Sequence, residues 1–165
     1  MLTKCISFKN FKLCKVDKKI KKDLTFLLQQ KSQVIKSLGK FYKNNYSKKT
    51  VQKLKKNNNI RIIGIGGSIL GAESIYSFLK HKIKKKIEFI SNLNQNYTLS
   101  KKKYTNLIIS KSGNTLETIT NYNILIKKKD INVFVTENKK SYLLSLAKKL
   151  KSEVINHNNF IGGRY

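Results

Sequence analysis

The sequence contains no proline and no tryptophan, and only two of its 36 basic residues are arginine. Average usage of about 5% would give roughly eight prolines in a chain of this length. Lysine, asparagine, isoleucine, tyrosine and phenylalanine are abundant instead, which is the composition that AT-rich codons produce. We therefore attribute most of the net charge of +28 to compositional drift on solvated faces of the protein.

The scarcity of arginine weighs against a protein that reads nucleic-acid sequence. A strongly positive net charge by itself indicates a partner such as nucleic acid or an anionic surface. Arginine, however, makes the commonest specific contact to bases, and the lysines are spread along the whole chain rather than confined to one tail or helix face. We therefore expect no specific nucleic-acid partner. A lysine-driven nucleic-acid binder stays an alternative function.

Long apolar runs are also lacking. No stretch of about 18 apolar residues occurs, so we expect neither a membrane-spanning helix nor a membrane partner. Lysines interrupt residues 1–19 too often for the apolar centre of a signal peptide. Cys5 and Cys14 lack CxxC spacing and a neighbouring His or Cys cluster, so we expect reduced thiols in a cytoplasmic protein and no metal site at these cysteines.

The hydrophobic pattern predicts an α/β fold. Apolar strands alternate with helical patterns, the strands at 60–65, 86–91, 105–110, 131–136 and 153–156 and the helices at 68–81, 115–129 and 140–151. The strands are nearly continuous apolar runs, which is typical of strands covered on both faces. This alternation predicts a parallel sheet with right-handed crossovers and flanking helices, in a doubly wound arrangement.

The N-terminal third of the chain has a different pattern. A stripe of leucine, isoleucine and valine with the helical period predicts a helix over residues 17–38, with Gly39 beyond its end. A shorter helix is expected over residues 47–56. We therefore expect two domains, a mostly helical N-terminal extension (1–56) and an α/β domain (57–165).

Residues 106–118, NLIISKSGNTLET, are the most informative segment, because an apolar strand runs into a hydroxyl-rich loop that opens a helix. Ser110, Ser112 and Thr115 offer hydroxyl donors, and Gly113 allows the backbone to turn where a Cβ would clash. The helix N-terminus adds free N–H groups and the positive end of the helix dipole. A phosphate group requires this environment. A plain strand–loop–helix junction with good capping residues is the alternative interpretation.

A second glycine-rich turn precedes this loop in residues 60–74, IRIIGIGGSILGAES. Gly64, Gly66 and Gly67 follow a strand and precede Ser68, so the backbone can approach a ligand closely. The spacing differs from the GxGxxG fingerprint of dinucleotide sites. A tight turn that packs a helix closely on the sheet is the alternative. Both loops lie at carboxyl ends of predicted strands, where open α/β sheets bind their ligands.

A third segment is the sequence FIGGRY at residues 160–165. Because arginine is so scarce, an arginine directly after two glycines indicates selection for a planar and permanently charged guanidinium group. A surface arginine at a frayed chain end is the alternative interpretation of Arg164.

Together the three segments resemble glucose-6-phosphate isomerases, a branch of the sugar-isomerase (SIS) fold family. GIGGSILGAES is similar to the GIGGSxLG turn of that family, SKSGNTLET to its SK[ST]xxTxET phosphate loop, and IGGRY to the start of its [VI]GGR[YF]S motif. The order and approximate separation of the motifs also agree. The resemblance covers residues 55–165, and Asn114 stands where the family usually has threonine.

The resemblance implies an aldose–ketose isomerase of glycolysis and gluconeogenesis that interconverts glucose 6-phosphate and fructose 6-phosphate through an enediol. It implies a cytoplasmic enzyme that needs no metal or organic cofactor and forms a homodimer when full-length. By position it assigns phosphate binding to Ser110, Lys111, Ser112 and Thr115, sugar binding to Gly67, Ser68 and Gly163, and stabilisation of the enediolate charge to catalytic Arg164.

The resemblance also implies groups that these motifs do not contain. Isomerisation needs a base that moves a proton between C1 and C2, and an acid–base pair that opens the ring. The family supplies a glutamate, a histidine and a lysine from segments beyond the GGR motif. We expect His81 and His157 to be solvated or structural, and Glu117 to brace its helix. We therefore expect a truncated and inactive chain, and a non-catalytic sugar-phosphate-binding SIS domain is the alternative.

Overall fold

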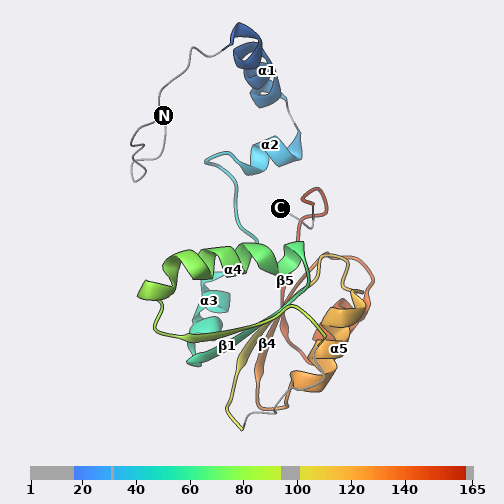
Figure 1. Cartoon of the computed structure of the whole chain (residues 1–165). Helices are drawn as coiled ribbons and strands as arrows, with labels where there is room; N and C mark the ends of the chain where they lie inside the picture. Colours follow the sequence, from blue (N-terminus) through green and yellow to red (C-terminus); the bar gives the residue numbers. More distant parts are fainter. Residues whose placement is uncertain (1–16, 31, 94–100, 163–165) are drawn as a thin grey trace. The chain divides into compact units, whose positions relative to one another are not determined.

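The computed structural model describes residues 17–30, 32–93 and 101–162, and the chain divides into two compact units between Tyr42 and Lys43. The first unit contains helices α1 (Lys18–Gln29) and α2 (Gln33–Ser37) (Figure 1). Within the described residues, no helix has the length and apolar character needed to cross a membrane.

The predicted helix over residues 17–38 is wrong in one respect, because it is interrupted after α1. Gln30 has extended backbone, with φ −62° and ψ 131°. Ser32 then begins α2 as its N-cap, and its hydroxyl accepts a hydrogen bond from the amide of Ile35. Serine competes with helix continuation by bonding nearby backbone amides, and this local bond overrides the apolar stripe.

The second unit contains the predicted α/β domain and also helix α3, which we expected in the N-terminal extension. Its elements are α3 (Lys48–Lys55), β1 (Asn59–Ile63), α4 (Gly67–Leu79), a short 3-10 helix η1 (Lys80–Lys82), β2 (Lys86–Ile90), β3 (Thr105–Ile109), α5 (Leu116–Leu125), β4 (Ile131–Thr136), α6 (Tyr142–Lys149) and β5 (Glu153–Asn156). The five strands form one sheet in the order β2-β1-β3-β4-β5, and all neighbouring pairs are parallel. The predicted fold class is therefore confirmed.

One row of apolar residues crosses the entire sheet. Register partners place its members side by side on one face, in the order Ile90, Ile63, Ile108, Phe134 and Val154. Helices α5 and α6 cover this face and contribute Tyr122, Leu125, Leu143 and Ala147 to the same core. Burial of these side chains attaches both helices to the sheet and is the main stabilising contribution on this face.

The opposite face carries a second apolar row, Phe89, Ile62, Leu107 and Val133, which ends at Glu153. Helix α4 packs here through Tyr76, whose ring lies 5.4 Å from that of Phe89. Helix α3 is attached to β5 because the Thr50 hydroxyl and the Lys53 ammonium both contact the Glu153 carboxylate. Both faces of the sheet are thus covered (Figure 1), which explains the continuous apolar strands.

Helix α5 ends four residues earlier than the predicted 115–129. Ile126 has extended backbone, with φ −85° and ψ 138°. The carboxylate of Asp130 then accepts hydrogen bonds from the backbone amides of Lys127 at 3.2 Å and Tyr104 at 3.0 Å. These bonds organise the turn into β4 in place of a further helical turn.

Glu153 makes the stability of the domain depend on pH. Hydrogen bonds from Lys53 and then Thr50 lower the pKa of Glu153 below its ordinary value of 4.5. A lowered pKa in the folded state means that the carboxylate stabilises the fold above pH 4.5 and that this stabilisation is lost as the pH falls through the folded pKa. Glu153→Gln should therefore destabilise the protein at about pH 7 and much less at about pH 3.

Chemical denaturation at both pH values measures this difference, with Glu73→Gln on α4 as the control variant. The prediction is wrong if Glu153→Gln and the wild type differ by the same free energy of unfolding at both pH values.

Candidate functional site

Two loops meet at the carboxyl edge of the sheet, where the strand order reverses. The chain leaves β1 toward β2 on one side and leaves β3 toward β4 on the other. The loops after these two strands lie next to each other, because β1 and β3 are paired. A Cβ on Gly64 would lie only 3.1 Å from the carbonyl oxygen of Ile109, so glycine permits this close approach. Open α/β sheets bind ligands at such a switch point.

The loop after β3 brings three hydroxyl groups together. Ser110 is almost fully buried, and its Oγ lies 2.9 Å from the Oγ1 of Thr115. The Oγ of Ser112 lies 3.5 Å from the same Oγ1. Thr115 is the N-cap of α5, but its side chain makes no capping bond to the helix amides. The three hydroxyls therefore form a cluster directly at the N-terminus of α5.

Gly113 holds this loop against α6 and β4. It has φ +66°, in the left-handed region that favours glycine. A Cβ there would lie 2.3 Å from Ser141 Oγ and 2.8 Å from Thr136 Oγ1. The Gly113 carbonyl also accepts the amide of Leu143 at 3.0 Å. Any other residue at this position would displace the loop or α6.

Asn114 has a structural role that the sequence did not reveal. Its side-chain carbonyl accepts a hydrogen bond of 2.8 Å from the amide of Tyr142, the first residue of α6. The loop therefore caps the N-terminus of the following helix. Asn114, which stands where the resemblance leads us to expect threonine, makes this contact through its side-chain carbonyl.

The loop that follows β1 leads directly into helix α4. Gly66 has φ +55° and ψ −128°, a conformation that is open to glycine. Gly67 and Ser68, which the resemblance assigns to the sugar, are half-buried residues of the first turn of α4. They follow the strand next to β3, so they lie at the same edge as the hydroxyl cluster.

Lys111 connects the hydroxyl loop to the segment after β5. Its ammonium donates hydrogen bonds to the backbone carbonyls of Asn159 at 3.0 Å and Ile161 at 2.6 Å. It also pairs with the carboxylate of Glu137 at 3.4 Å. The structure thus joins the loop to the residues that lead into Gly162. Gly163 and Arg164 lie outside the described residues.

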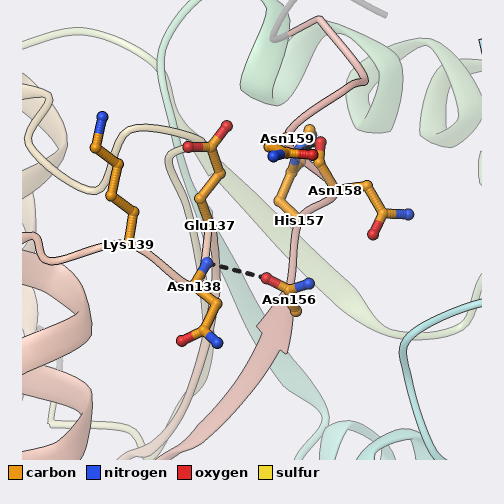
Figure 2. A pocket seen from close by; sticks show the side chains of 7 residues that line it. All are labelled: Glu137, Asn138, Lys139, Asn156, His157, Asn158 and Asn159. Carbon is orange, nitrogen blue, oxygen red and sulfur yellow. Dashed lines mark hydrogen bonds between the residues drawn. The ribbon is translucent and has the colours of Figure 1, made fainter.

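A polar cavity of about 420 Å³ lies beyond the ends of β4 and β5 (Figure 2). Its lining residues come from the last residue of β5 and the loops after the two strands and are Glu137, Asn138, Lys139, Asn156, His157, Asn158 and Asn159. The amide of Asn138 donates to the side chain of Asn156 at 3.0 Å, which joins the two loops. None of the three motifs contains a residue of this cavity. Its sequence signal is the polar run NHNN at the end of a short strand.

The remaining candidate acid–base groups are dispersed. His157 lines the cavity, and its Nδ1 lies 3.0 Å from the carbonyl oxygen of Asn158. His81 is exposed in η1, and Glu117 lies half-buried in the first turn of α5. In the part of the chain that the structure describes, no three His, Cys, Asp or Glu side chains gather into a metal-binding group. Cys5 and Cys14 lie outside that part.

Comparison with known proteins identifies relatives by sequence, although no protein-family model matches the chain. The glucose-6-phosphate isomerase of Methanocaldococcus jannaschii is 47% identical over 77 residues, which are 43% of this chain and 19% of that protein. The enzyme of Borreliella afzelii is 35% identical over 130 residues, which cover 67% of this chain and 24% of that enzyme. That of Mycoplasmoides gallisepticum is 32% identical over 145 residues, covering 76% and 34%. The chain thus spans between a fifth and a third of these relatives.

Solved structures share the fold at lower identity. A hypothetical protein of Thermus thermophilus superposes with a TM-score of 0.58 and 20% identity, covering 70% of this chain and 31% of that one. The tagatose-6-phosphate ketose/aldose isomerase of Escherichia coli gives a TM-score of 0.53 and 18% identity, covering 67% and 32%. The fold and the three motifs lead to the same conclusion: this chain is a homologue of glucose-6-phosphate isomerases over part of their length.

Proposed function

We propose that this chain forms the phosphate-holding and sugar-lining part of a glucose-6-phosphate isomerase. The reaction interconverts glucose 6-phosphate and fructose 6-phosphate through an enediol. The observation that carries the proposal is the cluster of Ser110, Ser112 and Thr115 hydroxyls at the N-terminus of α5, at the switch point of the sheet. The relatives named glucose-6-phosphate isomerase support the choice of substrate.

The hydroxyl cluster suits a phosphate dianion. Each hydroxyl can donate one hydrogen bond to a phosphate oxygen, and bonds to charged acceptors are stronger than bonds between neutral groups. In our proposal the backbone amide of Lys111 adds a further donor. The helix dipole of α5 favours negative charge at the same position. Gly113 keeps these donors in place before the ligand arrives, which lowers the entropy lost on binding.

The sugar and its reacting carbons would extend from the phosphate toward the neighbouring loops. We assign Gly67 and Ser68 to the sugar, because they begin α4 at the same edge of the sheet. Gly163 would contact the sugar, and Arg164 would stabilise charge on the enediolate oxygen, as an oriented cation in a dry site does. The two hydrogen bonds from Lys111 to Asn159 and Ile161 support this assignment, because they tie the preceding residues to the phosphate loop.

Proton transfer between C1 and C2 would need groups beyond the three motifs. The resemblance assigns these to a glutamate, a histidine and a lysine that follow the GGR motif in the family. We assign the sugar-phosphate site to residues 57–165, with residues 1–56 as an N-terminal extension. A cytoplasmic location and a homodimer of the full-length enzyme remain parts of the proposal.

A sugar-phosphate-binding domain without catalysis is the second candidate. The Vibrio vulnificus NanR protein, solved in complex with ManNAc-6P, shares the fold with a TM-score of 0.50 and 20% identity, covering 70% of this chain and 43% of that one. This candidate also uses the hydroxyl cluster, so binding alone does not separate the two. Both candidates predict no turnover by the isolated chain, so an activity measurement separates them only for a chain that also carries the glutamate, histidine and lysine that follow the GGR motif in the family.

Substitution of Thr115 by valine tests the phosphate site. Valine keeps the shape of the side chain and removes the hydroxyl. Fructose 6-phosphate should therefore bind less tightly, with a loss of about 1–2 kcal/mol in binding free energy. Ser110→Ala should act in the same direction. Isothermal titration calorimetry measures the affinities. Thr120→Val, the same change within α5 but away from the loop, is the matched control and should bind like the wild type. Equal affinity in all four proteins would place the ligand elsewhere.

The activity of the isolated chain distinguishes a binding part from a complete enzyme. We expect the purified chain to isomerise fructose 6-phosphate no faster than buffer, because positioned acid–base groups supply about 10²–10⁴-fold of the rate. A coupled assay for glucose 6-phosphate measures the rate. Turnover that is proportional to protein concentration and absent in Arg164→Ala would contradict this expectation. Glu117→Gln would then test the first candidate base.

A further inference from the structure

Lysine runs precede four of the five strands. They are Lys55 and Lys56 before β1, Lys84–Lys86 at the start of β2, Lys101–Lys103 before β3 and Lys127–Lys129 before β4. We call these residues the lysine edge. The runs are separated by 15 to 28 positions in the sequence, so they look dispersed there. Because all neighbouring strands are parallel, their amino ends lie together at one edge of the sheet.

Hydrogen bonds show that the lysine edge is continuous. The ammonium of Lys85 donates to the carbonyls of Lys55 at 2.8 Å and Asn57 at 2.6 Å. The side-chain amide of Asn59 donates to the carbonyl of Lys103 at 3.4 Å. The ammonium of Lys129 donates to the carbonyl of Lys101 at 2.6 Å. The four runs are therefore linked, in one case through Asn59, across β2, β1, β3 and β4.

The edge is hollowed at one place and has little negative charge. A cavity of about 690 Å³ is lined by Asn58, Asn59, Lys84, Lys85, Lys86 and Lys102. Two carboxylates on the adjoining strand and turn, Glu88 and Asp130, are already engaged. Asp130 accepts from the backbone amides of Tyr104 and Lys127, and Glu88 pairs with Arg61 at 3.0 Å. Positive charge is therefore concentrated at this edge beyond what the two carboxylates balance.

We propose that the lysine edge binds the phosphate backbone of nucleic acid without regard to its sequence. Ammonium groups act as point donors to phosphate oxygens. Direct base reading would favour arginine, and Arg61 is buried beneath the edge with its guanidinium over the Tyr104 ring. Because Arg61 covers one face of the Tyr104 ring, that face does not stack on a base. The phosphate backbone of the nucleic acid is then the principal target. The pattern suits non-specific electrostatic binding.

An anionic membrane is the less suitable partner. Apolar side chains that insert into the interface strengthen peripheral binding to lipid beyond the electrostatic attraction of lysines. None of the large exposed apolar side chains of the described residues lines the cavity at this edge. The cavity at this edge is lined by lysines and asparagines, which suit a hydrated, regularly charged polymer.

This surface is distinct from the sugar-phosphate loops. The hydroxyl cluster follows the carboxyl end of β3 and the glycine-rich loop follows that of β1, whereas the lysine edge lies at the amino ends of these strands. The strands between them have five residues, so the two sites are roughly 16 Å apart along the strand direction. Occupation of one site should therefore leave the other accessible.

Fluorescence anisotropy with a labelled DNA duplex of about 20 base pairs tests the proposal. Binding should be independent of sequence and should weaken steeply with salt, by about 0.9 logarithmic units per logarithmic unit of salt for each phosphate contacted. The variant Lys84→Gln, Lys86→Gln, Lys101→Gln and Lys103→Gln should lose about 10- to 100-fold in affinity at low salt, and its salt slope should fall by about three to four.

A matched control removes the same charge elsewhere. The variant Lys18→Gln, Lys19→Gln, Lys21→Gln and Lys22→Gln changes four exposed lysines of α1, and its affinity should stay within about threefold of the wild type. A third variant with arginine at Lys84, Lys86, Lys101 and Lys103 keeps the charge and should retain binding. Circular dichroism and thermal melting establish that each variant is folded.

Several outcomes would overturn the proposal. Equal loss in the two glutamine variants would mean that net charge alone drives binding. Displacement of the duplex by saturating fructose 6-phosphate would mean that the duplex binds at the hydroxyl loop. Binding that prefers one duplex sequence at physiological salt would contradict non-specific contact. Binding to phosphatidylserine vesicles that depends on the four edge lysines, without binding to the duplex, would identify a membrane as the partner.

Discussion

Hydrogen bonding between parallel strands is the interaction on which the other features of the second unit depend. It aligns Ile63 with Ile90 and Ile108, and so builds one apolar row against α5 and α6. The same pairing sorts the connecting loops by the strand end they adjoin. Loops after strands gather glycines and hydroxyls at one edge, and loops before strands gather lysines at the other. Two chemically different surfaces thus follow from one topology.

The candidate phosphate loop is held by contacts with elements that follow it in the chain. Gly113 fits against Ser141 and Thr136 with no room for a Cβ, and Asn114 caps α6. Lys111 reaches the backbone after β5. These contacts hold the loop against β4, α6 and the segment after β5. They leave part of the hydroxyl cluster for a ligand. Such preorganisation lets the interaction with a ligand contribute to affinity without a large cost of ordering the loop.

The local pattern predicted most of the secondary structure of the α/β domain. The predicted bounds of β4 and β5 are confirmed, and the other strands differ by one or two residues. Two errors have a common cause. Ser32 and Asp130 bond nearby backbone amides, and these bonds end or restart a helix where the apolar pattern continues. Hydrophobic periodicity reports which face is buried, but it does not register such short-range competition from polar side chains.

The sequence by itself determined the α/β class, the parallel alternation and the hydroxyl-rich and glycine-rich turns at strand ends. It could do so because these depend on neighbouring residues and on periodicity. Only the tertiary structure decided that Lys111 contacts Asn159 and Ile161, that Asn114 caps α6, and that the separated lysine runs form one edge. Each of these contacts joins residues about 20 to 50 positions apart. No local pattern encodes them, because strand order and register bring such residues together.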